Sequence, residues 1–199
     1  MKKKTIFILI LIIVVVIASV VIIGLSQQND TIADKRITEI VTGNYELLTS
    51  IVDRLDKYEK EDEIYIADAG DVELDSSIQE GKLYAFRIAS AENDSTIADA
   101  MDDKDILNFL ESTEIEKISI QKNIFAFEAD ALSQDSGDYG FCGFYYSLNS
   151  KPQIVLFDDN CELKKNHDGW YIEFDDGVSS YYTEKITDSF YYYEGVFCP

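Results

Sequence analysis

The 199-residue chain has few of the residues on which enzyme and metal sites are usually built: one histidine, three cysteines and two prolines. A histidine-based catalytic site would depend on His167, which lies in the turn sequence Asn166–Gly169, and no G-x-S-x-G nucleophile motif occurs. One histidine and three widely spaced cysteines do not supply the ligand set of a zinc site. We therefore predict a non-enzymatic protein with no catalytic and no metal-ligating residue, and no cofactor.

Basic residues are also scarce, since 17 Lys and Arg stand against 38 Asp and Glu. Three of the 17 lie in the first four residues, so the chain after residue 25 carries 14 basic and 38 acidic side chains and a net charge of −24. A charge of this sign repels nucleic acid and anionic lipid headgroups and attracts basic surfaces. We expect no nucleic-acid partner, and a basic protein or peptide as the partner, if there is one.

What the chain does have is one long apolar run near its start. The basic cap (residues 1–5) precedes Ile6–Leu25, which contains no charged residue and would form a helix about 30 Å long, the thickness of the bilayer core. The cap predicts a cytoplasmic N-terminus and an extracytoplasmic domain after residue 25, in a single-pass cell-membrane protein. A signal peptide cleaved near Gly24–Ser26 is the alternative, but the run is longer than such peptides need.

Residues 26–60 are predicted to form a short polar stalk (26–30) and a juxtamembrane amphipathic helix that begins at Asp30 or Thr31. Gly43–Asn44 interrupts the pattern, so either two helices or one bent helix would satisfy it. The helix packs on the domain core or forms a seam for a partner. Its apolar positions recur at steps of three and four: Ile37, Ile40, Val41, Leu48, Ile51, Val52, Leu55 and Tyr58.

Residues 61–132 are predicted to be a mixed α+β region with an antiparallel sheet. A helix is expected from Ser95 or Thr96 to Leu110, with Ile97 and Met101 on its apolar face. Strand-like segments surround it at 63–67, 82–88, 115–120 and 124–129.

Residues 133–140 (SQDSGDYG) are predicted to be a connector, and the tyrosine-rich remainder (141–199) a six-strand β-meander. Closely spaced turn signals divide this remainder. The expected strands are 141–148, 153–157, 161–165, 170–174, 178–186 and 189–198.

The sequence of this last part also resembles a known group of proteins. The motifs GFYYS (Gly143–Ser147), Trp170, YYTEKI (Tyr181–Ile186) and FYYYE (Phe190–Glu194) are similar to the end module of small membrane-anchored or exported proteins of Gram-positive bacteria. The resemblance covers the last third of the chain and implies an extracytoplasmic setting. Members of that group are uncharacterised, so it implies no activity and no site residue.

The tyrosines of the meander are the candidate binding residues. Side chains alternate between the two faces of a strand, so one set of rings fills a core and the other lies on an aromatic outer face. Such a face is typical of recognition surfaces, while ordinary packing within the sheet is the alternative. The candidates are Tyr145, Tyr181, Tyr191 and Tyr193.

Cysteines at the two ends of the meander are a candidate disulfide. If the first and last strands pair antiparallel, Cys142 and Cys198 become neighbours, and an extracytoplasmic location permits their oxidation. Cys161 is then the odd thiol. Three unpaired thiols in an open sheet are the alternative.

Calcium is the one metal ion that the acidic composition leaves open, at the turns 135–138, 158–160 and 175–177, although none matches an EF-hand loop. Taken together, these features indicate an acidic, non-enzymatic binding or interaction module at the cell envelope. Two alternatives remain open: a cell-wall-active hydrolase that uses carboxylates, and a passive structural spacer.

Overall fold

The structure, a computed structural model, divides the chain into two compact units, residues 1–35 and 36–199. Only residues 32–35 of the first unit are described, so the account below concerns the second. The described ranges are 32–58, 64–68, 82–88, 96–121, 123–129, 139–155, 161–166, 168–174 and 179–197.

The predicted membrane anchor is not covered by these ranges. Within them, no helix is both long enough and apolar enough to cross a bilayer. The basic cap (1–5), the apolar run (6–25) and the stalk (26–30) all lie outside the described residues, so they stay predictions.

The predicted helical segment consists of two helices and a 3-10 turn, one of the two forms that the sequence left open: α2 (Ile32–Gly43), α3 (Tyr45–Leu55) and η1 (Asp56–Tyr58). The break falls at the predicted Gly43–Asn44, where the Asn44 side-chain amide donates to the Ile40 carbonyl at 2.9 Å. This bond satisfies a backbone acceptor at the end of α2. Except for the half-buried Tyr58, the residues of the predicted stripe are buried, so it is core.

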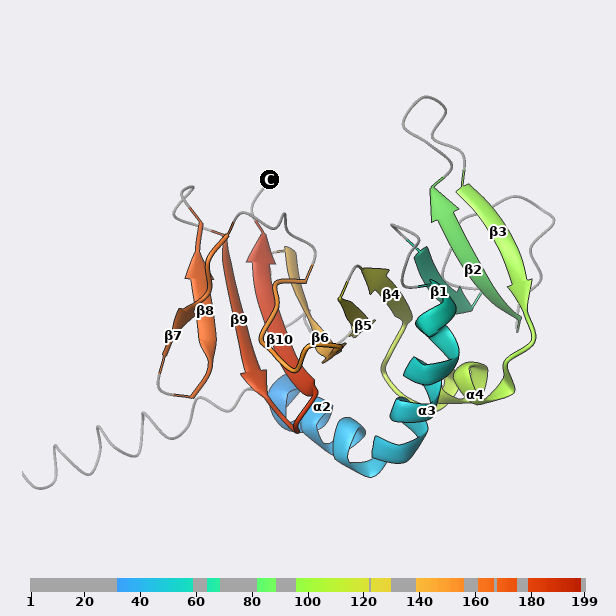
Figure 1. The fold of residues 1–199 in the computed structure, drawn as a ribbon, viewed down its shortest axis with the longest axis horizontal. Helices are drawn as coiled ribbons and strands as arrows, with labels where there is room; N and C mark the ends of the chain where they lie inside the picture. The colour runs from blue at the N-terminus through green and yellow to red at the C-terminus, as the bar shows by residue number, and fades with distance from the viewer. Residues whose placement is uncertain are drawn as a thin grey trace, which may run out of the picture. The chain divides into compact units, whose positions relative to one another are not determined.

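The strands form one ten-stranded antiparallel sheet in the order β3-β2-β1-β4-β5-β6-β10-β9-β8-β7 (Figure 1). The predicted mixed α+β class with an antiparallel sheet is therefore confirmed. The strands are β1 (Ile64–Asp68), β2 (Leu83–Ile88), β3 (Thr96–Met101), β4 (Lys117–Gln121), β5 (Ile124–Glu128), β6 (Tyr139–Ser147), β7 (Lys164–Lys165), β8 (Trp170–Glu173), β9 (Ser180–Lys185) and β10 (Phe190–Phe197).

One face of the sheet, here the helix face, packs against α3 and α4 (Lys104–Ser112). Phe109 of α4 meets Phe127 edge-on, with ring centroids 6.1 Å apart, and Phe127 stacks on Phe144 at 4.5 Å. Tyr45 at the start of α3 contacts Phe190 of β10 in the same way, at 5.7 Å. Aromatic pairs from two helices and three strands thus join the helices to the sheet.

The helix predicted from Ser95 or Thr96 to Leu110 is wrong in its first half, where the structure has β3. Ile97 and Met101 are four residues apart, a spacing that suits one face of a helix and also one face of a strand. Pairing with β2 over six residues decides for the strand. The helix begins instead after Asp103, whose carboxylate accepts hydrogen bonds from the backbone amides of Asp105 and Ile106.

The predicted six-strand meander is also corrected. Residues 152–155 are not a strand, and only Lys164–Lys165 of the expected 161–165 segment pairs. β7 to β10 do form a meander, and β10 then pairs with β6 as well as with β9. The last strand, β10, therefore lies between β6, the first strand of this region, and β9.

The connector predicted at 133–140 lies mostly outside the described residues, and β6 begins at Tyr139. β5 and β6, which flank it, pair antiparallel from Ile124–Ser147 to Glu128–Gly143. The sheet therefore continues from the middle part of the chain into the tyrosine-rich part.

Candidate functional site

All four tyrosines predicted to form an outer aromatic face are buried. Tyr145, Tyr181, Tyr191 and Tyr193 expose between 0% and 2% of their surface. They share one face, as the alternation predicted, and their rings stack in pairs: Tyr145 on Tyr191 at 5.2 Å, and Tyr181 near Tyr193 at 6.2 Å. The expectation that these rings are exposed is therefore corrected.

The cover over these rings is the chain itself. Residues 148–155, here the crossing segment, pass over the face of the sheet opposite the helices, and Val155 is fully buried among the tyrosines. The sequence could not show this cover, because alternation tells which residues share a face and not which face is covered.

Tyrosine hydroxyls hold the backbone of the crossing segment in place. The Tyr145 hydroxyl accepts a hydrogen bond from the Gln153 amide at 2.8 Å. The Tyr181 hydroxyl accepts from the Val155 amide at 3.3 Å and donates to the Gln153 carbonyl at 3.1 Å. These bonds satisfy backbone groups of residues 152–155, which pair with no strand among the described residues.

Burial also changes the acidity of these tyrosines. It raises the pKa of Tyr145 and of Tyr181 well above the ordinary value, because the phenolate would be desolvated. For Tyr145, hydrogen bonds with Thr183 and the Gln153 amide offset part of this rise. Both groups are therefore neutral hydrogen-bonding residues of the core.

The predicted disulfide between Cys142 and Cys198 stays a prediction, since Cys198 lies outside the described residues. The strand pairing on which it depends is present: β6 and β10 are antiparallel, and Cys142 lies opposite Glu194. The Cys142 thiol donates to the Ala129 carbonyl at 3.4 Å. A bond to Cys198 would require the chain after Phe197 to turn back toward Cys142. Cys161 is half-buried.

The three acidic turns that the sequence left open for calcium lie wholly outside the described residues, as does His167. Within the described ranges, no group of three or more His, Cys, Asp or Glu side chains is placed to hold a metal ion. The calcium hypothesis therefore stays a prediction.

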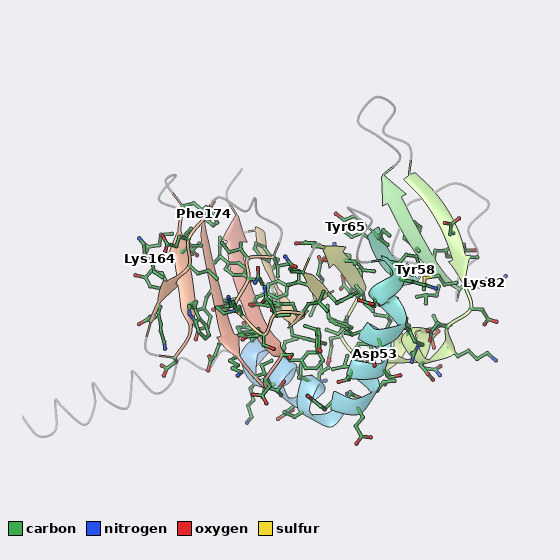
Figure 2. The ribbon with its side chains drawn as sticks, in the orientation of Figure 1. Asp53, Tyr58, Tyr65, Lys82, Lys164 and Phe174 are labelled. Atoms are coloured by element: carbon green, nitrogen blue, oxygen red, sulfur yellow. The ribbon has the colours of Figure 1, made fainter. Side chains whose placement is uncertain are left out.

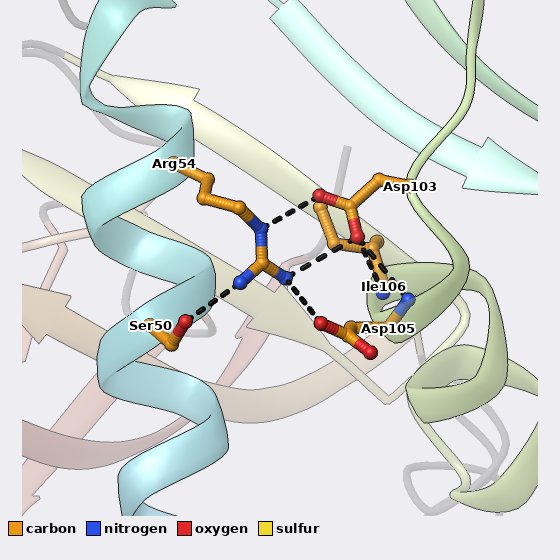
Figure 3. Close-up of polar contacts among 5 residues, drawn as sticks. All are labelled: Ser50, Arg54, Asp103, Asp105 and Ile106. Atoms are coloured by element: carbon orange, nitrogen blue, oxygen red, sulfur yellow. Dashed lines mark hydrogen bonds and ion pairs between the residues drawn. The ribbon is translucent and has the colours of Figure 1, made fainter.

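The most connected charged group among the described residues joins α3 to α4 (Figure 3). Arg54 Nε and Nη2 bind the Asp103 carboxylate at 2.8 and 3.2 Å, Nη2 lies 3.5 Å from Asp105, and Nη1 donates to Ser50 at 2.6 Å. Burial alone would raise the pKa of Asp103. The bonds from Arg54 and from the α4 amides outweigh burial and hold that pKa below its ordinary value.

A pocket of about 380 Å³ lies next to this group. Its wall on the helix side comes from α3 and η1, and its other wall comes from the end of β3 and the turn that follows. The lining residues are Arg54, Leu55, Lys57, Tyr58, Ala100, Met101, Asp102 and Asp103. Arg54 is engaged by Asp103, Asp105 and Ser50, and Lys57 lies over the Tyr58 ring, 4.7 Å from its centroid.

A half-buried surface of tyrosines and carboxylates lies on the helix face of the last strands. The register sets Tyr171 of β8 beside Tyr182 of β9, and Tyr182 beside Glu194 of β10. Glu173 and Glu184 lie on the same face, two residues along their strands. These five residues, here the tyrosine–carboxylate face, are half-buried except Glu173, which is exposed.

Two hydrogen bonds fix two of the three carboxylates of this face, those of Glu184 and Glu194. The Tyr182 hydroxyl donates to Glu184 Oε2 at 2.8 Å, and the buried Tyr192 donates to Glu194 Oε2 at 2.7 Å. Gly169 leaves room for this arrangement, because a Cβ there would lie 2.8 Å from the Tyr182 hydroxyl oxygen and 2.4 Å from the Thr183 carbonyl. Each carboxylate has about four acceptor positions, so one tyrosine bond leaves others for a ligand.

The sequence contained a signal for this surface, because Tyr182 and Tyr181 must face opposite ways. The prediction that Tyr181 faces outward was wrong, because Tyr181 is buried and Tyr182 lies on the half-buried surface. The pairing of Tyr171 with Tyr182 follows from the β8–β9 register, which no local pattern specified.

Comparison with protein-family models, curated proteins and solved structures found no match to this chain. The likeness of its tyrosine-rich motifs to exported Gram-positive proteins therefore stays a prediction.

Proposed function

We propose that the protein is a single-pass membrane protein whose acidic extracytoplasmic domain binds a basic protein or peptide through the tyrosine–carboxylate face. The observation that carries the proposal is the cross-strand group of Tyr171, Tyr182, Glu184 and Glu194, which is half-buried and has its carboxylates fixed.

The chemistry of this face suits lysine and arginine side chains. Their alkyl stems pack on aromatic rings, their charge is attracted to the ring face, and their N–H groups donate to carboxylates. Tyrosine loses little conformational entropy when it is buried by a partner. Glu184 and Glu194 are already oriented by tyrosine hydroxyls, so binding need not restrict them further.

The membrane setting is supported by the sequence alone. A run of twenty uncharged residues after three lysines is typical of an anchor that keeps its N-terminus in the cytoplasm. The domain that follows has a charge opposite to that of the proposed partner, which favours rapid encounter.

The binding test uses the full chain in a non-ionic detergent and a fluorescein-labelled peptide of alternating lysine and proline. Proline lacks an amide N–H, so this probe cannot bind by adding a strand to the sheet. Removing two charges with Glu184→Gln and Glu194→Gln should weaken binding about tenfold, since each exposed ion pair contributes up to about 1 kcal/mol. The glutamine carbonyl oxygens can still accept the hydrogen bonds of the Tyr182 and Tyr192 hydroxyls.

The matched control is Glu39→Gln with Glu46→Gln, which removes the same charge from two exposed helical positions. It should change the affinity less than about twofold. Equal losses in the two double variants would mean that net charge alone attracts the probe. If the peptide does not bind the unaltered chain, the result would favour the alternative of a passive structural spacer.

The topology is tested by fractionation of cells that express the full chain. The protein should be in the membrane fraction, and protease added to intact cells should remove the domain after residue 25. Protein found mainly in the medium and starting at Gln27 would contradict the retained anchor.

A further inference from the structure

The two outer strands of the sheet differ in how they are protected against pairing with another chain. β7, at one end, has two residues, and both are exposed lysines, Lys165 and Lys164, of which Figure 2 labels Lys164. Short, lysine-bearing edges are the usual protection of natural sheets. β3, at the other end, has six residues and contains neither lysine nor proline.

The outer side of β3 is accessible in its second half. Asp99 and Ala100 point to opposite faces of the sheet, and both are exposed. Among the residues that the structure describes, β3 pairs with β2 alone. In an antiparallel strand about half of the backbone N–H and C=O groups point away from the neighbour, so this edge offers hydrogen bonds to an added strand.

The pocket described above lies at the C-terminal end of this edge. Ala100 and Met101, the last two residues of β3, form part of its lining, and the exposed Asp102 follows them. A strand added to β3 would therefore end beside a pocket with a carboxylate at its rim. Backbone bonds along an edge with a pocket for a side chain are the two parts of peptide recognition by strand addition.

Charge decides between the two candidate occupants of the edge. A second copy of this chain paired antiparallel along β3 would join two domains of strongly negative charge, and a register that sets Asp99 opposite Asp102 of the other copy would also place like charges side by side. An extended peptide with lysine or arginine residues would meet Asp99 on one face of the strand, or Asp102 just past its end, with attraction instead.

We infer that β3 is a docking edge for an extended, basic segment of a partner protein, which pairs with the strand backbone and places a cationic side chain near Asp102. This site is separate from the tyrosine–carboxylate face and does not depend on it. Asp99 and Asp102 set the preference for a basic segment, and the backbone of Thr96–Met101 supplies most of the hydrogen bonds.

The test compares two peptides that differ only in their ability to pair. One is a fluorescein-labelled peptide of alternating valine and lysine, and the other is the same peptide with alternate backbone nitrogens methylated along one edge. Strand addition requires those N–H groups, so the methylated peptide should bind the full chain at least about tenfold more weakly. Amide hydrogen exchange of β3 should slow when the first peptide is bound.

Two variants of the protein locate the site. Ala100→Lys places a lysine on the exposed edge, as β7 has naturally, and should weaken binding of the valine–lysine peptide about tenfold. The matched control is Thr42→Lys, which adds the same charge at an exposed position of α2 and should leave the affinity within about twofold.

Several results would overturn the inference. Equal affinity for the methylated and unmethylated peptides would show attraction by charge alone. If hydrogen exchange slows on strands other than β3, or if the unmethylated peptide does not bind, then β3 is not the docking edge. Sedimentation that shows self-association of the chain, abolished by Ala100→Lys, would make a second copy the occupant.

Discussion

The hydroxyl oxygen of Tyr145 lies 2.8 Å from the backbone nitrogen of Gln153, eight residues further along the chain, and accepts its hydrogen bond. The same hydroxyl lies 2.9 Å from Thr183 Oγ1 on β9. One side chain thus joins the crossing segment to two strands of the sheet. Tyrosine rather than phenylalanine is needed there, because a buried amide without an acceptor costs about 1–3 kcal/mol.

Tyr145→Phe should therefore lower the free energy of unfolding by about 1–3 kcal/mol. Urea unfolding of the full chain, followed by the fluorescence of Trp170, measures this, since the indole lies 6.2 Å from the Tyr191 ring. Tyr146→Phe is the control, because the half-buried Tyr146 faces the other way and contacts Phe190 through its ring. A control effect as large as that of Tyr145→Phe would show that the hydroxyl bonds to the crossing segment do not matter.

Alkaline pH should weaken the fold through the same tyrosines. Burial raises the pKa of Tyr145, Tyr181 and Tyr191 in the folded state, while the unfolded value is about 10. Below about pH 10 both states keep these protons and the stabilisation is complete. Above it the unfolded state loses protons first, so the free energy of unfolding falls as pH rises.

Absorbance of tyrosinate near 295 nm measures this directly. In the folded chain a fraction of the thirteen tyrosines should titrate only above the ordinary range, and in urea all should titrate together near pH 10. A folded chain in which all tyrosines titrate together at that pH would mean that the rings are not buried.

The sequence predicted part of this architecture and missed part of it for one physical reason. Local patterns located the α2–α3 stripe and its break at Gly43–Asn44, as well as the alternation of Tyr181 and Tyr182. They could not show that residues 148–155 return over one face of the sheet. That segment packs against tyrosines of β9 and β10, which are too far away in the sequence for a local pattern to include both. The same limit hid β3, whose pairing with β2 overrides a spacing that also suits a helix.

Arg54→Gln should lower the free energy of unfolding by about 1–3 kcal/mol, because it leaves the partly buried Asp103 without its cation. The control is Lys57→Gln, which removes the same charge from an exposed position on η1 and should cost less than about 0.5 kcal/mol. Urea unfolding at neutral pH compares the two.

The difference between the unaltered chain and Arg54→Gln should shrink in acid. The pKa of Asp103 is lowered in the folded state, so its stabilisation is present above the unfolded value of about 3.9 and is lost as pH falls through the folded value. Unfolding measured from about pH 6 down to about pH 3 tests this. A difference that stays constant over that range would contradict the assignment.

Two buried serines should respond in opposite ways to substitution by alanine. Ser119 Oγ is buried and has no hydrogen-bond partner among the described residues, so Ser119→Ala should leave stability unchanged or raise it by up to about 1 kcal/mol. Ser147 Oγ donates to the Lys151 carbonyl at 2.7 Å and accepts from the Lys151 amide at 3.2 Å, so Ser147→Ala should cost about 1–3 kcal/mol. Thermal unfolding of both variants decides, and a loss at Ser119 as large as at Ser147 would contradict the comparison.

The measurement that tests the proposed binding function most directly is the association rate of the lysine–proline peptide with the full chain at low and at high salt. Attraction between exposed charges is screened over about 8–10 Å at physiological ionic strength, so the rate should fall about tenfold or more as salt rises. Glu184→Gln with Glu194→Gln should reduce the rate at low salt and flatten this dependence, and Glu39→Gln with Glu46→Gln should not. A rate that does not respond to salt, or that responds identically in both double variants, would contradict recognition at the tyrosine–carboxylate face.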